Sequence, residues 1–191
     1  MQSNWQKLLF FPPQGIKNHS VSKKGSLSFD EIVLLILNSE WLRAEYALIA
    51  QIEFDKKDAL SLLAFLDLRT RNFARLSRLI PKLNENYQDD PFVRALIVFW
   101  FLLINSKEVL SISNKTYWEG EQNCTYLALA HGHWLLANHE YSECQQLIDN
   151  LLPEITLDRA TLQAKLYSFN RDYSKAIEIL MPWKDLALAN Q

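Results

Sequence analysis

Residues 164–177, AKLYSFNRDYSKAI, hold the pattern that decides the fold of this chain. The small residue Ala164 is followed three positions later by Tyr167, then by a polar turn, and then by Tyr173 and Ala176. Two short apolar segments around a polar turn are typical of two antiparallel helices. The stretch therefore predicts a helical hairpin.

The same arrangement recurs along the chain. Aromatic or turn-following positions, at intervals of 34, 34 and 32 residues, are occupied by Phe73, Lys107, Tyr141 and Tyr173. Nine residues before each lies a smaller position, occupied by Ala64, Val98, Gly132 and Ala164. Three residues after each lie Leu76, Leu110, Cys144 and Ala176. A period in this range predicts stacked helical pairs, in which each pair covers an apolar side of the next.

The stretch from Ala164 to Ile177 resembles a tetratricopeptide repeat (TPR), a family that favours a small residue, a tyrosine, a polar turn, an aromatic residue and an alanine in this order. Earlier copies depart from the pattern, because Asp67 occupies one tyrosine position and Lys107 one aromatic position. Over residues 57–182, the resemblance implies an all-α chain folded as an α-α superhelix of stacked antiparallel helix pairs. Another α-α superhelix or an irregular helical bundle is the alternative.

The sequence divides into an irregular N-terminal arm, residues 1–27, and a TPR-like helical repeat domain, residues 28–191. Ser28 and Glu31 predict a capping box at the start of the first helix, and the polar stretch 84–90 predicts a loop. The expected helix pairs cover residues 28–53, 57–84, 91–113, 123–152 and 156–182.

The N-terminal arm combines loop signals with apolar side chains. Pro12 and Pro13 favour an irregular backbone, whereas Trp5 and residues 8–11 form an apolar patch. The patch docks either on the chain's own surface or on a partner.

The resemblance also assigns a partner-binding groove, because the first helix of each pair lines the concave surface of a TPR array. The groove residues are Phe65, Leu68, Arg69, Phe99, Leu102, Leu103, Tyr126, Leu129, His133, Leu136, Thr161, Lys165 and Phe169. This mostly apolar set favours an apolar segment of a protein partner, bound by burial of its surface. As alternatives, these residues are ordinary core, the N-terminal arm covers them, or the helix register differs.

Cations in and beside the groove limit the choice of partner. Family members that clamp a peptide's terminal carboxylate use several cations there, whereas here Arg69, His133 and Lys165 are spread over three pairs, which disfavours a clamp. A second, basic strip follows one face of a single helix. This strip faces solvent, or it binds an acidic protein partner. Nucleic acid is the least suitable partner, because the strip contains no aromatic residues. The strip consists of Arg71, Arg75, Arg78 and Lys82.

We predict no metal site, no cofactor and no enzymatic activity. His131, His133 and His139 lie between Cys124 and Cys144, a composition that suggests a metal site. Side chains two residues apart on a helix point about 200° away from each other, so His131 and His133 cannot share an ion. The sequence also lacks a glycine-rich phosphate motif and an evident paired nucleophile and base.

The composition indicates a folded domain, and the repeat period is typical of helical arrays that act as protein–protein interaction modules. The hydrophobic content of 49% supports a core, and the net charge of −2 gives no general attraction to nucleic acid. The longest apolar run, residues 95–104, is short beside the roughly 20 residues that span a bilayer. Two cysteines form no disulfide framework and no signal peptide is evident, so we expect a cytoplasmic location.

Two functions remain open at this point. By analogy of size and architecture, the chain is an adaptor, an assembly factor or a bacterial secretion-type chaperone that holds an apolar segment of a partner. The alternative is a recruiting or oligomerisation domain of a larger enzyme or complex, including a homo-oligomer.

Overall fold

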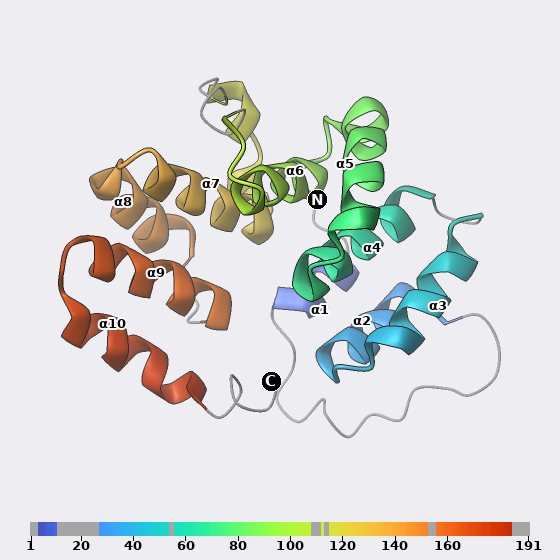
Figure 1. Ribbon diagram of the computed structural model, residues 1–191, viewed down its shortest axis with the longest axis horizontal. Coiled ribbons are helices and arrows are strands. Elements are labelled where there is room, and N and C mark those ends of the chain that lie inside the picture. The colour runs from blue at the N-terminus through green and yellow to red at the C-terminus, as the bar shows by residue number, and fades with distance from the viewer. Residues whose placement is uncertain are drawn as a thin grey trace. The chain divides into compact units, whose positions relative to one another are not determined.

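The computed structural model describes residues 4–10, 27–53, 56–107, 112, 115–152 and 156–184 (Figure 1). In these ranges the chain is helical and contains no strand, so the all-α prediction is confirmed. The α-helices are α1 (Asn4–Phe10), α2 (Phe29–Leu37), α3 (Trp41–Gln51), α4 (Lys56–Thr70), α5 (Phe73–Tyr87), α6 (Pro91–Leu103), α7 (Thr125–Ala137), α8 (Tyr141–Leu151), α9 (Leu157–Phe169) and α10 (Tyr173–Leu180). The described 3-10 helices are η3 (Lys115–Trp118), η4 (Glu121–Asn123) and η5 (Met181–Trp183).

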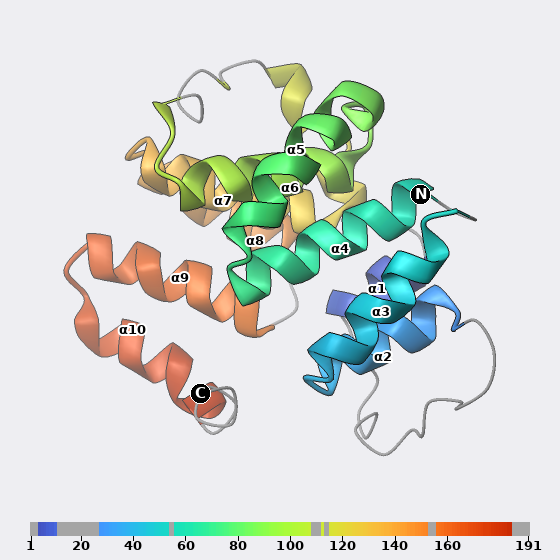
Figure 2. The same ribbon diagram turned by 45° about the vertical axis from the view of Figure 1, so that its right-hand side comes forward.

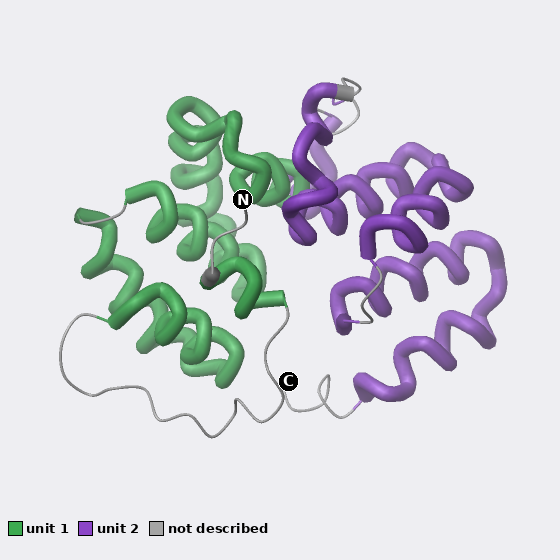
Figure 3. The backbone as a smooth tube through the Cα atoms, turned by 180° about the vertical axis from the view of Figure 1, so that it is seen from behind, with its two compact units in different colours: residues 1–100 green, residues 101–191 purple. Residues whose placement is uncertain are grey.

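The chain forms two compact units, residues 1–100 and residues 101–191 (Figure 3). In the first unit α1 packs on α2, α2 on α3, α3 on α4 and α4 on α5. In the second unit α7, α8, α9 and α10 pack in the same successive way, and α7 also contacts α9. Figures 1 and 2 both show α9 and α10 lying side by side and antiparallel. Neighbouring helices therefore pack in sequence order within each unit.

Five turns share one backbone conformation. In each turn a residue other than glycine adopts a left-handed φ between 51° and 64°, and these residues are Ser39, Arg71, Asn105, His139 and Arg171. The residue after each donates its N–H, over 2.8–2.9 Å, to the carbonyl five positions earlier, which is the hydrogen bond of a Schellman helix end. The turn residues follow one another after 32, 34, 34 and 32 positions, so the local geometry recurs at the spacing found in the sequence.

The helix boundaries agree with the sequence at some positions and differ at others. The capping box is present, since the Ser28 hydroxyl accepts from the Glu31 N–H and the Glu31 carboxylate accepts from the Ser28 N–H. The loop prediction for residues 84–90 is wrong for its first four residues, because α5 continues to Tyr87. Leu83, which is fully buried, carries the apolar face of α5 into this last turn. The predicted second helix of the pair 91–113 lies mostly outside the described residues.

The N-terminal arm is not irregular throughout, because residues 4–10 form helix α1. Three apolar side chains of this helix are buried. Trp5 and Leu9 lie one turn apart, and Phe10 follows Leu9. The Trp5 ring meets Phe92 of α6 edge-on at 5.2 Å, and its Nε1 donates to Asp58 of α4 over 2.8 Å. Burial of this apolar face stabilises a helix too short to form alone.

The small residues of the recurring sequence pattern lie where neighbouring helices approach each other closely. Ala64, Val98, Gly132 and Ala164 are all buried. A Cβ at Gly132 would lie 2.5 Å from Cδ2 of Leu162, so α9 approaches α7 at the point where a side chain is missing. The Sγ of Cys144 on α8 contacts the Gly132 carbonyl oxygen at 3.5 Å on another side. Small residues thus permit close packing of α7 with both neighbours.

Candidate partner-binding site

In the first unit, helix α1 covers part of the surface predicted to be a groove. Phe65 is buried, and its ring centroid lies 6.2 Å from that of Phe10 and 6.3 Å from that of Phe92. Phe65 therefore belongs to an internal aromatic cluster. Helix α1 of the N-terminal arm docks on the chain's own surface, which is one of the two alternatives given for the arm. The other predicted groove residues of this unit are half-buried or exposed, namely Leu68, Phe99 and Arg69.

The second unit contains a pocket of about 910 Å³ between the end of α6 and helices α7, α9 and α10. Its α9 wall shows a helical spacing, with lining residues one turn apart on one face. The lining residues are Leu102, His133, Leu136, Ala137, Thr161, Ala164, Lys165, Ser168, Phe169, Tyr173, Ala176, Ile177 and Leu180. The pocket is therefore predominantly apolar.

Part of the predicted groove coincides with this pocket. Six predicted groove residues line it, namely Leu102, His133, Leu136, Thr161, Lys165 and Phe169. Three others of the same unit do not, because Tyr126 and Leu129 are buried within α7 and Leu103 is exposed elsewhere. The α10 wall lies outside the predicted set, because that set comes from the first helix of each pair, whereas Tyr173 and Ala176 lie on the second helix of the last pair.

The pocket walls combine buried and accessible apolar groups. Leu136 is 3% exposed and belongs to the core, whereas Phe169, Tyr173 and Ile177 are 52%, 61% and 63% exposed. Three large apolar side chains on adjoining helices, all open to solvent around one cavity, are typical of a surface that binds another molecule.

Two titratable groups lie in the pocket wall. Burial, together with the positive charge of Lys165, lowers the pKa of His133 to about 3, so its imidazole is neutral at pH 7. Burial also lowers the pKa of Lys165 from its ordinary value. The hydroxyls of Thr161 and Ser168 donate to carbonyls of their own helix, those of Leu157 and Ala164, over 2.8 Å each. Lys165 is thus the one charged donor among the described lining residues.

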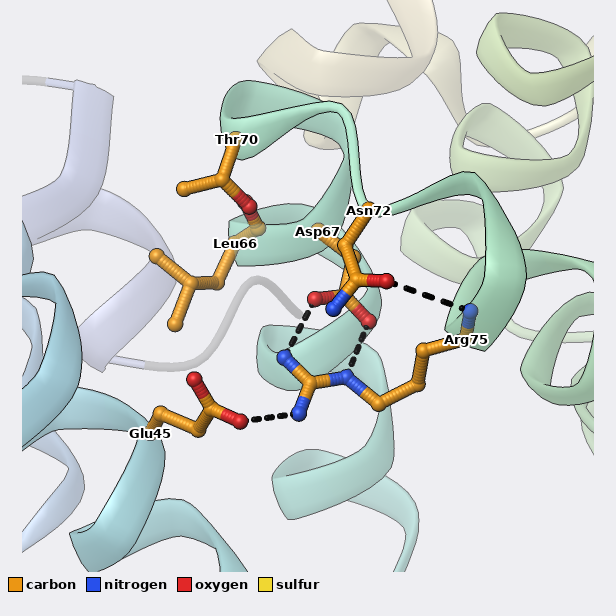
Figure 4. A network of polar contacts seen from close by, with 6 residues as sticks. All are labelled: Glu45, Leu66, Asp67, Thr70, Asn72 and Arg75. Atoms are coloured by element: carbon orange, nitrogen blue, oxygen red, sulfur yellow. Dashed lines mark hydrogen bonds and ion pairs between the residues drawn. The ribbon is translucent and has the colours of Figure 1, made fainter.

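The predicted basic strip on α5 is divided by the structure. Arg71, Arg78 and Lys82 are exposed, whereas the guanidinium of Arg75 contacts two carboxylates within the first unit (Figure 4). Arg75 Nε donates to Asp67 Oδ2 over 2.6 Å, a second nitrogen of Arg75 contacts Asp67 Oδ1, and a third contacts Glu45 of α3. An acidic partner would therefore meet three cations of the strip, because Arg75 is engaged inside the chain.

Burial dominates the electrostatics of this internal network. The Asp67 side chain has no exposed surface, and burial raises the pKa of its carboxyl while Arg75 opposes the shift. The hydrogen bond to Asp67 is the main cause that raises the pKa of Arg75 above its ordinary value. Asp67 occupies the position where the family pattern has tyrosine, and the structure accommodates it by pairing it with Arg75.

The histidines considered for a metal site have separate environments. The His131 ring stacks on Trp118 at 4.1 Å, and its Nδ1 lies 2.6 Å from a carboxylate oxygen of Glu121, whereas His133 lines the pocket. Cys124 and Cys144 are both buried and are not joined in a disulfide, and burial raises the pKa of Cys144 to about 12. Within the described ranges, no three His, Cys, Asp or Glu side chains are grouped so that they could hold a metal ion.

Comparison with protein-family models, curated proteins and solved structures finds no match to this chain. The resemblance to TPRs therefore depends on the sequence positions given above. In the part of the chain that the structure describes, none of the helices is both long and apolar enough to cross a membrane.

Proposed function

We propose that this chain is a cytoplasmic, TPR-like interaction module whose second unit holds an apolar segment of a protein partner. As an adaptor, assembly factor or bacterial secretion-type chaperone, it would shield that segment from water. The observation that carries the proposal is the apolar pocket of about 910 Å³ with Phe169, Tyr173 and Ile177 exposed around it. The recurring left-handed turns support a repeat architecture for the helix pairs.

Burial of apolar surface supplies the binding free energy in this proposal. Each square ångström of apolar surface removed from water contributes about 25 cal/mol, and association opposes this with lost motional freedom. A short apolar helix that fills the pocket would bind in the micromolar range, which suits transient protection of a partner.

The test uses a fluorescent amphipathic peptide helix without acidic residues, titrated with the full chain and followed by anisotropy. Ile177→Asp or Phe169→Asp should weaken binding at least about tenfold, because each places a carboxylate in the pocket. Both side chains are exposed, so folding should be retained and circular dichroism should be unchanged. Ile104→Asp is the matched control, because Ile104 is 46% exposed in the same unit and does not line the pocket. Equal affinity for all four proteins would contradict the proposal.

A second candidate function, recruitment or oligomerisation within a larger enzyme or complex, has its own observation. Leu42, Tyr46 and Ile49 form an exposed apolar stripe at helical spacing on α3, with 72%, 74% and 49% of their surfaces accessible. Under this function the chain should self-associate or bind another domain through α3. Light scattering of the wild type and of Tyr46→Asp measures this, and a monomer at all concentrations disfavours self-assembly.

A further inference from the structure

Helices α9 and α10 correspond position by position to α4 and α5 of the first unit. The left-handed turn residue is Arg71 in the earlier pair and Arg171 in the later pair, which fixes the alignment. On this alignment Ile80 of α5 corresponds to Leu180 of α10. Ile80 is 3% exposed and Leu180 is 37% exposed. At this position the helix is thus covered in the first unit and accessible in the second.

In the first unit, α6 packs against the earlier pair through two aromatic contacts. Phe92 of α6 meets Phe65 of α4 with ring centroids 6.3 Å apart, and Trp100 of α6 meets Phe73 of α5 at the same separation. Phe92 and Trp100 lie eight residues apart on α6. In the first unit, the helix that follows the α4–α5 pair is therefore apolar and contacts the pair through two aromatic side chains eight residues apart.

The corresponding positions of the later pair differ in chemistry. Lys165 takes the place of Phe65, and Tyr173 takes the place of Phe73. None of the described lining residues of the pocket is acidic, so no carboxylate among them neutralises Lys165. Suppose that a partner helix packs on α9 and α10 as α6 packs on α4 and α5. The partner residue that corresponds to Phe92 would then lie next to the Lys165 ammonium. A carboxylate at that position complements the charge, whereas an apolar side chain would cover an unpaired cation.

We propose that the pocket of the second unit binds a partner helix that packs as α6 does, with an acidic residue facing Lys165 and a large apolar residue eight positions later facing Tyr173. This inference rests on the proposed function and adds the partner's pattern to it. The acid lies within the apolar helix and is a side chain, which distinguishes it from a terminal carboxylate.

The test uses three labelled peptide helices that carry the apolar face of α6 and solubilising residues elsewhere. They differ only at the position of Phe92, where they have Glu, Gln or Phe. Anisotropy titrations with the full chain should give about fivefold to tenfold tighter binding of the Glu peptide than of the Gln peptide, as for a charge-assisted contact. Salt should reduce this preference, because the ion pair forms near the protein surface.

Lys165→Phe is the variant that converts the later pair to the chemistry of the earlier one. It should bind the Phe peptide most tightly and lose the preference for Glu over Gln. Lys165→Met serves as a second variant, which should bind the Glu and Gln peptides equally. Lys165 lies in the wall of the pocket and outside the apolar core, so both variants should fold, and circular dichroism checks this.

Each outcome of these titrations has a separate meaning. Equal binding of the Glu and Gln peptides to the wild type would overturn the acidic pattern and leave the proposed function standing. No binding of any peptide would overturn both. Binding that appears only after deletion of residues 185–191 would assign the pocket to the chain's own segment and overturn the partner helix.

Discussion

The α4–α5 and α9–α10 pairs share a backbone turn and treat charge in opposite ways. In the earlier pair Asp67 is buried and pairs with Arg75, eight residues later. In the later pair the corresponding residues are Tyr167 and Lys175, and the ammonium lies 5.8 Å from the centroid of the tyrosine ring. A cation at this position can reach either a carboxylate or an aromatic ring. The chain thus accommodates either a carboxylate or a tyrosine at this position when the residue eight positions later is a cation.

The largest effect is expected when Arg75 is removed. Arg75→Met leaves the Asp67 carboxylate buried without its main counter-charge, and we expect a loss of about 3–5 kcal/mol in the free energy of unfolding at pH 7. Urea denaturation measures this loss. Because burial raises the pKa of Asp67, the deficit should shrink as pH falls, since the protonated carboxyl needs no counter-charge.

Two further variants serve as controls for Arg75→Met. Lys175→Ala removes the corresponding cation of the later pair, which is exposed and pairs with Asp172 over 2.8 Å, and it should change the free energy of unfolding far less than Arg75→Met does. Asp67→Leu combined with Arg75→Met should recover most of the lost stability, because no buried charge remains. Similar losses for Arg75→Met and Lys175→Ala would show that the two pairs do not differ as described.

The next effect concerns the face that is covered in one pair and accessible in the other. Ile80→Ala should cost about 3 kcal/mol, because it leaves a cavity under a residue that is 3% exposed. Leu180→Ala should cost under about 1 kcal/mol, because Leu180 already contacts water. Urea denaturation of the two variants gives the comparison. An equally large loss for Leu180→Ala would mean that the α10 face is covered in solution.

The sequence predicted the helical class and the first capping box because the signals for both are local. Apolar periodicity and caps such as Ser28 act within a few residues, and the structure has helices and a capping box there. Helix α1 was missed because its stability comes from contacts with distant Phe65 and Phe92. The superhelix remains a proposal, because it depends on how successive pairs stack.

The candidate site was predicted less well, and the reasons are physical. Phe65 and Lys165 occupy corresponding positions, so spacing alone treats them alike, yet α1 and α6 bury one of them while the other lines a pocket. Likewise, Arg75 and Arg78 lie on one helix, and only the structure shows that two carboxylates engage Arg75. Which surfaces stay accessible depends on packing between segments that are far apart in the sequence.

A smaller effect is expected from His133 in the pocket of the second unit. Its pKa of about 3 lies below the ordinary value of 6.5, so its contribution to stability is present above pH 6.5 and is lost as pH falls below it. From about pH 7 to about pH 5, we expect the free energy of unfolding to fall by about 1–2 kcal/mol through this group. Urea denaturation of the wild type and of His133→Leu at both pH values isolates it. A decline just as steep in His133→Leu would contradict the assignment.

The smallest effect tests whether the two pairs are alike at their turns. Arg71 and Arg171 hold φ at 57° and 63°, a conformation that glycine adopts without steric cost. Arg71→Gly and Arg171→Gly should each stabilise the chain by about 0.5–1 kcal/mol, less than the full relief of strain because glycine also gains freedom in the unfolded chain. The midpoints of urea denaturation measure the change in stability of both variants. Equal gains would show that the turns are equivalent although their surroundings differ, whereas a gain at one turn and a loss at the other would show that one arginine side chain stabilises its turn.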